Sequence, residues 1–548
     1  MPELLLSSAE YTGYISIIKF LVFLLLFFLW LPIIGWVYND AKAVGTKEVM
    51  WTAVILATGA VAVIIFLFIP VFLVGALIYA IAVTTASLIY VKHRNARVMD
   101  YARVLTAEHI KSLFAGKDKD LDELKGFLFV TANNNEVTLP QAQTPEFFGY
   151  KSAYEILTDA TWRRASDIIF SPASQNYSVT YYVDGVPLKQ PPIARGQMEY
   201  SINLLKNLAD LETREKRKPQ KGMFKIRRGR KDTEWELTTA GSTAGEQVRL
   251  KKIIKQSASR MADIGLMPEQ LEQLNNLRAL KQGFFIVTGP QKTGVTTTFY
   301  ALLRNHDAFI NSINTLEKRP SAELPNITQN VFTLSDSGTT SYATKLQEII
   351  RMGPDIVGVA DCQDIETART ICLAARDGKI IYTILTADSV VMATGKWLKL
   401  VGDKNLAAQT LLGICNQRLV RKLCEECKQA YAPNKELLRK FNIPADKVKA
   451  LYRTGKVIIG KRGKEMTCEH CQGTGYVGRT GIFEIIMIND QLRKTIIKSK
   501  SLSEIGAQFR ATKMFYLQEQ ALRKVINGTT SINEMIRVLS PPTKPKEK

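Results

Sequence analysis

Long apolar stretches near the beginning of the chain differ from the alternating pattern that follows them. Residues 17–38 carry a single charge, Lys19, and residues 50–91 carry none but contain Pro70. A helix that crosses a bilayer needs about 20 apolar residues, and proline removes a hydrogen bond inside a helix. The pattern therefore predicts three transmembrane helices, at about 17–38, 50–69 and 71–91. A re-entrant hairpin over 50–91 is the alternative.

Basic residues mark one end of these stretches. Lys42 and Lys47 lie between the first two, and Lys92 and Arg94 follow the third. Short loops rich in lysine and arginine stay on the cytoplasmic side of a membrane. We therefore expect the N-terminus outside and the main body in the cytoplasm, beginning with a cytoplasmic linker over 98–147.

After residue 148, short apolar strands alternate with helical stretches. The segment GFFIVTG, residues 283–289, is a buried strand that leads into a glycine loop, and PDIVGVAD and KIIYTIL are strands of the same type. Such alternation builds a mostly parallel sheet with helices on both faces. The predicted fold class is therefore α/β: transmembrane helices, then a small α/β domain, then a parallel-sheet domain that holds the glycine loop.

The composition is basic, with 73 lysines and arginines against 51 acidic residues and a net charge of +22. Such a charge suits anionic lipid headgroups or nucleic acid. One basic stretch, Arg214–Lys231, contains only one aromatic residue, Phe224, whereas proteins that hold single strands stack bases on aromatic side chains. We therefore expect a solvated loop or an interface strip there, and no nucleic acid as partner.

Four of the seven cysteines form two C-x-x-C pairs, Cys424 with Cys427 and Cys468 with Cys471. Two such pairs suit a tetrahedral four-cysteine zinc site, which is usually structural and closed. His470 lies between two of these cysteines, and we do not expect it to be a ligand. Surface thiols without metal are the alternative.

The glycine loop is close to the phosphate-binding pattern G-x-x-x-x-G-K-[ST], in which a lysine reaches the outer phosphate oxygens. Val295 occupies the lysine position and cannot donate to a phosphate. Lys292, three residues earlier, is a candidate replacement. The candidate nucleotide-binding residues make up the whole loop: Gly289, Pro290, Gln291, Lys292, Thr293, Gly294, Val295, Thr296 and Thr297.

Segments in uninterrupted order over residues 148–535 resemble the GspE/PilB-like ATPase family of type II secretion and type IV pilus assembly. They include YYVDGV, EKRKPQKG, GPQKTGVTTTFYALL, TLEKRP, PDIVGVADCQDIETA and CQGTGYVGRTGIFEI. The resemblance implies an N-terminal α/β domain over 148–255 and a RecA-like domain over 256–540, with a zinc-binding subdomain at about 420–480. It also implies hexamers that hydrolyse ATP beneath an inner-membrane platform protein. The first 147 residues lie outside the resemblance, and we expect 541–548 to be a disordered tail.

Positions at which the family carries catalytic acids have changed. Glu317 matches the acid that orients the attacking water, but Lys318 replaces its acidic neighbour and is expected to pair with it. Asp361 replaces the Walker B glutamate, and Gln363 replaces an arginine. Glu317 and Asp361 are therefore candidate catalytic residues of a vestigial kind.

Positions at which the family carries cationic or histidine side chains have changed as well. Lys379 and Thr386 stand in place of two histidines, and Glu236 stands in place of an arginine. The R-x-R-x-D-G pattern of the family reads TYYVDG here, residues 180–185, without its arginines. Losing one preorganised donor costs about 3–4 kcal/mol of transition-state stabilisation.

These losses predict a membrane-anchored, degenerate member of the family that acts as a catalytically inactive scaffold or regulator in the bacterial inner membrane. The expected partners are the inner membrane, the platform protein and an active paralogous ATPase in a hetero-hexamer. Structural Zn²⁺ is the expected cofactor, and binding of ATP with Mg²⁺ is left open. The alternatives are a slow ATP-hydrolysing assembly motor and a nucleotide-binding sensor.

Overall fold

The computed structural model describes residues 17–44, 46–96, 104–105, 124, 126–140, 144–253, 259–333, 341–443, 448–455, 457–459, 465–512 and 514–540. Most of the predicted linker and the whole predicted tail over 541–548 lie outside the described residues. The chain divides into two compact units, one built mainly from residues up to Lys251 and the other mainly from those after it.

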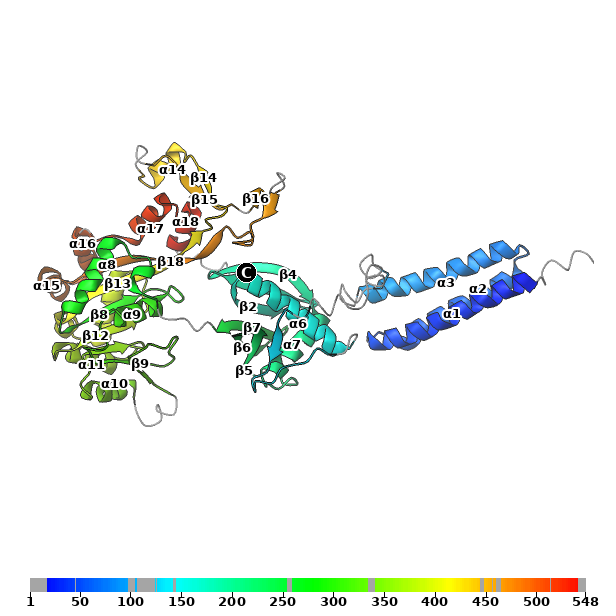
Figure 1. Ribbon diagram of the computed structural model, residues 1–548, viewed down its shortest axis with the longest axis horizontal. Helices are drawn as coiled ribbons and strands as arrows, with labels where there is room; N and C mark the ends of the chain where they lie inside the picture. Colours follow the sequence, from blue (N-terminus) through cyan, green and yellow to red (C-terminus); the bar gives the residue numbers. More distant parts are fainter. Residues whose placement is uncertain are drawn as a thin grey trace, which may run out of the picture. The chain divides into compact units, whose positions relative to one another are not determined.

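The apolar stretches form three long helices, as predicted. They are α1 (Ile17–Ala43), α2 (Glu48–Phe68) and α3 (Phe72–Asn95), drawn in blue in Figure 1. The helical conformation is interrupted around Pro70, between α2 and α3. Each helix contains a window that is long and apolar enough to cross a membrane. The helices therefore fit a membrane anchor by length and composition.

Small residues and one ion pair hold the three helices together. The indole of Trp30 on α1 lies so close to Gly59 on α2 that an added Cβ would overlap it, which is how small residues let helices approach within membranes. Near the end of α1, the carboxylate of Asp40 accepts hydrogen bonds from the Tyr90 hydroxyl (2.7 Å) and from Nε of Arg94 (2.8 Å) on α3. This ion pair ties the end of α1 to the end of α3.

The N-terminal sheet has seven strands in the order β1-β5-β6-β7-β2-β3-β4. Asp184 and Gly185, both at positive φ, form the tight turn between β3 and β4, as suits a two-residue hairpin. The elements of this region are β1 (Leu128–Val130), α6 (Pro145–Trp162), β2 (Ala165–Pro172), β3 (Asn176–Val183), β4 (Val186–Ala194), α7 (Arg195–Leu208), β5 (Gln220–Arg228), β6 (Lys231–Ser242) and β7 (Gly245–Ile253).

Two segments of this region differ from the sequence prediction. β1 lies within the predicted linker and pairs antiparallel with β5, so the sheet begins earlier in the chain than residue 148. The basic stretch Arg214–Lys231 is not a loop throughout, because its middle forms β5 with Phe224 and Ile226 buried. Side chains alternate between the two faces of a strand, so Phe224 and Ile226 face inward while Lys225 and Arg227 lie on the other face. Four charges on one short segment concealed that alternation.

The C-terminal sheet is the predicted, mostly parallel one, in the order β10-β9-β11-β12-β8-β13-β18. Its neighbours are parallel except for the antiparallel pair of β13 and β18. The strands are β8 (Gly283–Thr288), β9 (Ile313–Glu317), β10 (Thr328–Val331), β11 (Ile356–Val359), β12 (Ile380–Leu385), β13 (Leu411–Leu423) and β18 (Tyr476–Met487). The helices around it are η3 (Met261–Asp263), α8 (Pro268–Asn275), η4 (Asn276–Ala279), α9 (Val295–Leu303), α10 (Tyr342–Arg351), α11 (Ile365–Arg376), α12 (Val390–Val401), α13 (Lys404–Gln409), α15 (Asp490–Lys498), α16 (Leu502–Ala511), α17 (Leu517–Ile526) and α18 (Ile532–Leu539).

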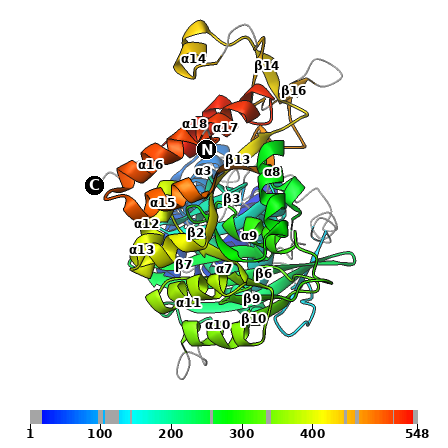
Figure 2. The ribbon, with the colours of Figure 1, turned by 90° about the vertical axis from the view of Figure 1, so that its left-hand side faces the viewer.

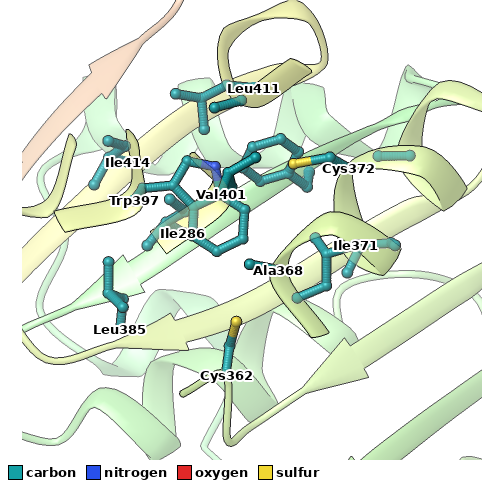
Figure 3. Close-up of a cluster of buried hydrophobic side chains, with 14 of the residues drawn as sticks. Ile286, Cys362, Ala368, Ile371, Cys372, Leu385, Trp397, Val401, Leu411 and Ile414 are labelled. Atoms are coloured by element: carbon teal, nitrogen blue, oxygen red, sulfur yellow. The ribbon is translucent and has the colours of Figure 1, made fainter. Parts of the chain in front are cut away.

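A large apolar core lies between this sheet and helices α11 and α12. Figure 3 shows the indole of Trp397 from α12 among Ile286 of β8, Leu411 of β13 and Cys372 of α11, all of them buried. The rings of Trp397 and Phe284 lie 5.0 Å apart. Burying an aromatic side chain contributes roughly 1.5–3 kcal/mol. This core fixes β8, and therefore the strand end from which the glycine loop begins.

A smaller arm extends between β13 and β18, at the top of Figure 2. Leu451 of β15 packs with Val420 of β13 and with Ala521 of α17 in a separate apolar cluster. The elements of the arm are β14 (Gln429–Tyr431), α14 (Lys435–Lys440), β15 (Leu451–Arg453), β16 (Val457–Ile459) and β17 (Glu465–Thr467).

Candidate nucleotide site and metal centre

The glycine loop keeps the backbone shape of a phosphate-binding loop. It leaves the fully buried strand β8 and enters α9 at Gly294, which is left-handed at φ 85°. Nε2 of Gln417 on β13 donates to the Thr293 carbonyl (2.8 Å), and the Thr293 hydroxyl donates to the Pro290 carbonyl (2.7 Å). First-turn N–H groups of a helix and the turn before it form an anion-binding cradle. The loop therefore has the backbone arrangement of such a cradle, and nucleotide binding there stays a prediction.

The cation of the loop is absent from its usual position. The half-buried Val295 packs against the apolar cluster beneath α9, and an added Cβ on Gly289 would lie 3.1 Å from its Cγ2. Lys292, the predicted replacement, is exposed and left-handed at φ 63°, a conformation that costs a side-chain-bearing residue roughly 1–2 kcal/mol. The loop is therefore lined by an alkyl group where a phosphate would need a donor.

Glu317 lies at the end of β9, on the same edge of the sheet as the loop, but its carboxylate is enclosed. The residue is 2% exposed. Its oxygens accept hydrogen bonds from the Tyr300 hydroxyl (2.5 Å), the Thr315 hydroxyl (2.9 Å) and Nε2 of Gln329 (3.2 Å). Burial, and then the Glu317 carboxylate, raise the pKa of Tyr300. Three of the roughly four acceptor positions of this carboxylate are therefore occupied by donors of the fold itself.

Lys318 does not form the expected ion pair with Glu317 among the described residues. Its ammonium lies 5.8 Å from the ring centre of Tyr342, a cation–π distance, whereas Glu317 points into the core. Successive residues of an extended strand face opposite sides, which explains the separation. Asp361, half-buried after β11, accepts a hydrogen bond from the backbone N of Lys318 (3.2 Å). Its carboxylate therefore joins the ends of two strands.

Among the other positions, two have partners within the fold and two are exposed or half-buried. Asp364, in the family-like segment PDIVGVADCQDIETA, caps α11 by accepting from the backbone N (2.7 Å) and hydroxyl (2.7 Å) of Thr367. Thr386 is exposed and Lys379 is half-buried. In the N-terminal sheet, Glu236 forms an ion pair with Lys221 at 2.7 Å. Asp364 thus acts as a helix cap, a role that requires no nucleotide.

Sequence reasoning missed two pairs of residues near this edge of the sheet. Tyr300 and Gln417, which hold Glu317 and the loop, were not singled out, although Tyr300 lies on the buried face of the loop helix. Glu484 of β18 is buried, accepts from the backbone N of Val390 (3.3 Å) and has a pKa raised by burial. Nearby, Arg418 donates to the Asp388 carbonyl (2.9 Å). The segment GIFEI contained Glu484 as the only charge in an apolar run, which was the available signal.

The four predicted metal ligands come together in the arm. The sulfurs of Cys424, Cys427, Cys468 and Cys471 all lie within 4.8 Å of one another, and all four residues are buried. Sγ of Cys424 is 3.9 Å from Sγ of Cys468, and Sγ of Cys427 is 3.6 Å from Sγ of Cys471. His470 is exposed and does not belong to the cluster.

These distances fit a tetrahedral ion. Zinc–thiolate bonds of about 2.3 Å in a tetrahedron place neighbouring sulfurs about 3.8 Å apart. Around the cluster, the backbone N of Gly475 donates to Sγ of Cys471 (3.3 Å), as outer-shell donors do for thiolate ligands. The cluster is therefore compatible with a zinc knuckle.

The sheet, the glycine loop and its helix define a phosphate-loop fold, and comparisons with known proteins identify the family. The model of the family described as "Type II/IV secretion system protein" matches residues 149–537. The chain therefore belongs to this family, as the sequence resemblance indicated.

Curated relatives agree with this assignment. The type II secretion system protein HxcR of Pseudomonas aeruginosa is 30% identical over 385 residues, covering 70% of this chain and 76% of the relative. The type II secretion system protein E of Dickeya dadantii is 31% identical over 388 residues, covering 70% and 74%. The type IV pilus assembly ATPase PilB of Thermus thermophilus is 27% identical over 424 residues. That match covers 77% of this chain but 46% of PilB, so the chain spans less than half of that relative.

Among solved structures, the Legionella pneumophila ATPase DotB aligns with a TM-score of 0.49 at 16% identity, covering 72% of this chain and 96% of DotB.

Proposed function

We propose that this chain is a membrane-anchored member of the secretion and pilus-assembly ATPase family that does not turn over ATP and serves as a scaffold or regulator. The proposal rests on the edge of the C-terminal sheet where the glycine loop, Glu317 and Asp361 lie, which we call the catalytic edge. Val295 leaves the loop without its cation, and Glu317 is enclosed by Tyr300, Thr315 and Gln329. Phosphoryl transfer depends on positive charge at the phosphates and on a free carboxylate to orient water.

The anchor and the arm supply the other parts of the proposal. Helices α1, α2 and α3 would hold the protein in a bacterial inner membrane, with the body in the cytoplasm. The four-cysteine cluster would hold structural Zn²⁺, which closes the arm through Cys424, Cys427, Cys468 and Cys471. The relatives named as secretion and pilus-assembly proteins motivate a platform protein and an active paralogous ATPase, in a shared hexamer, as partners.

The test measures nucleotide binding and phosphate release separately, on the full chain in detergent. We expect the wild type to release no phosphate above background and to show a small thermal shift at about millimolar Mg-ATP. Val295→Lys restores a charge-assisted bond, which is worth about 1.5–3 kcal/mol, so its nucleotide affinity should rise roughly 10–100-fold. Val295→Met is the matched control, since it adds length without charge.

Phosphate release distinguishes an inactive scaffold from a slow assembly motor. We expect Val295→Lys to bind nucleotide and still release no phosphate, because Glu317 stays enclosed. Phosphate release by the wild type that Glu317→Gln abolishes would overturn the proposal in favour of a slow assembly motor.

A nucleotide-binding sensor is the second candidate, and the intact loop backbone favours it. Gly294 and Thr293 hold the cradle in shape without help from a lysine. A ligand at 100 times its Kd stabilises a protein by about 2.7 kcal/mol. A clear thermal shift of the wild type with Mg-ADP, without phosphate release, would select this function over a scaffold.

A further inference from the structure

A polar cavity opens in the N-terminal unit, away from the glycine loop in the chain. Its volume is about 410 Å³, within the range of small-ligand pockets. It lies between the start of β3, helix α7, the loop before β5 and the hairpin between β6 and β7. Its lining includes Tyr177, Arg195, Lys216, Arg217, Ser242 and Glu246. None of these residues was singled out as a site residue.

Two of the cations that line the cavity have no ion-pair partner among the described residues. Arg195 pairs with Glu199 at 3.2 Å, and Glu246 pairs with the fully buried Lys206 at 2.7 Å. Lys216 and Arg217 line the cavity, and their side chains have no ion pair or hydrogen bond among the described residues. Both carboxylates at the cavity are therefore already neutralised, and the lining presents a net positive charge.

The basic stretch Arg214–Lys231 thus has two different halves. In β5, Lys221 pairs with Glu236, and Arg227 pairs with Glu136 and Asp232. In the loop before β5, Lys216 and Arg217 have no such partners among the described residues, and both line the cavity. Within a stretch that reads as uniformly basic in sequence, Lys216 and Arg217 are the two cations that lie at this cavity.

The other groups of the cavity complete a site for an oxyanion that also carries a donor. Ser242 and Thr243 bring hydroxyl groups from the hairpin between β6 and β7. Oε1 of Glu246 accepts from Lys206, which leaves Oε2 as an acceptor. Lys206 also donates to the Glu215 carbonyl (2.6 Å), so the base of the site is held rigidly by a buried pair. Arginine and lysine side chains favour phosphate and carboxylate oxygens.

We propose that this cavity binds a small, soluble metabolite that carries phosphate or carboxylate groups together with a hydroxyl donor. Lys216 and Arg217 would contact the anionic oxygens, Glu246 would accept from the hydroxyl, and the ring of Tyr177 would form an apolar wall. The site is lined by residues of the N-terminal unit and shares none with the glycine loop.

Calorimetric titration of the full chain in detergent tests the proposal with three probes: inorganic pyrophosphate, ribose 5-phosphate and citrate. We expect at least one probe to bind with a Kd below about 1 mM, and the probe that binds separates phosphate from carboxylate ligands. The double variant Lys216→Gln with Arg217→Gln should weaken that binding at least tenfold. The matched control is Arg228→Gln with Arg230→Gln, which removes two exposed cations of the same stretch outside the cavity.

Two further comparisons locate the binding. Lys292→Gly, which removes the cation of the glycine loop, should leave the Kd for the probe unchanged, whereas Glu246→Gln should weaken ribose 5-phosphate more than pyrophosphate. The proposal is overturned if no probe binds at about 10 mM, or if the variant pairs at Lys216/Arg217 and Arg228/Arg230 weaken binding equally. It is also overturned if binding follows Lys292.

Discussion

The catalytic edge of the C-terminal sheet and the cysteine arm belong to the same unit, but they differ in which side chains of their predicted sites are present. The arm has all four sulfurs at distances that suit a tetrahedral ion. The catalytic edge has its glycine loop, its parallel strands and its helix cap at Asp364, but Val295 and an enclosed Glu317 stand where chemistry is expected. The arm has the four side chains that its proposed metal needs, whereas the sheet edge lacks the lysine that its proposed nucleotide would need.

The difference separates folding from catalysis. A structural metal site contributes directly to the folded state, so loss of one ligand removes stability at once. The lysine of a phosphate loop contributes to binding and turnover instead, and the sheet forms without it. Glu317 illustrates the point, because it has become part of the packing through Tyr300 and Thr315.

The largest effect is expected at the arm. Cys424→Ser, or a strong chelator, should reduce bound zinc from about one ion per chain to near zero and lower the free energy of unfolding of the arm by several kcal/mol, because metal binding is coupled to folding. Elemental analysis and hydrogen exchange across β14 and β15 measure the two effects. His470→Ala, an exposed neighbour outside the cluster, is the control and should keep its metal. Full folding of the metal-free arm would contradict the claim that the metal site stabilises the arm.

The core beneath the catalytic edge predicts an acid response. Nε2 of His306 lies 2.7 Å from the Tyr382 hydroxyl, and burial, with a smaller effect of Arg278, lowers the pKa of His306 from 6.5 to about 4. The unfolded chain therefore binds the proton more readily, so this contribution is complete above pH 6.5 and is lost as the pH falls towards 4. The loss amounts to at most about 3 kcal/mol. Thermal unfolding of the wild type and of His306→Gln between pH 4 and 7 measures it, and the variant should show a flatter dependence, whereas His470→Gln should not.

A smaller effect is expected at Glu317. Glu317→Gln should lower the free energy of unfolding by about 1–3 kcal/mol, because an amide N–H would replace an acceptor that faces buried donors. In an active member of the family, the same substitution would mainly lower the rate of ATP hydrolysis. The exposed Glu366 of α11 supplies the matched control, Glu366→Gln, with an expected change below about 0.5 kcal/mol. Unchanged stability together with lost phosphate release would restore Glu317 to a catalytic role.

The smallest effect concerns Lys292. Replacing it by glycine relieves a left-handed side-chain-bearing residue, and after the entropic cost of glycine we expect a gain of about 0.5–1 kcal/mol. Gln291→Gly is the control in the same loop, and it should destabilise because Gln291 is not left-handed. Denaturant unfolding compares the two variants. A loss of nucleotide response in Lys292→Gly would show that this lysine had taken over the missing function.

Much of the fold could be predicted because the patterns are strong and local. The apolar runs predicted the three helices, and the strand GFFIVTG predicted β8 and the loop that follows it. β1 was missed, because Leu128–Val130 is a strand of three residues whose pairing with β5 depends on residues about 100 positions away. Short edge strands carry too little periodicity to be recognised alone.

The site was predicted unevenly for a similar reason. Spacing identified the loop and the four cysteines, whose geometry follows from their motifs. The environment of Glu317 could not be predicted, since its donors Tyr300 and Gln329 come from a helix and a strand that only the folded sheet brings together. The pairing assigned to Lys318 was wrong because adjacent strand residues face opposite sides.

The ion pair between Asp40 and Arg94 also orders events during synthesis. The two residues are 54 positions apart in the chain. A ribosome adds about 5–20 residues per second, so the carboxylate of Asp40 waits about 3–10 s for its guanidinium. A chain cut short before Arg94 lacks both this bond and the end of α3. The ion pair therefore distinguishes a completed set of three helices from an interrupted translation product.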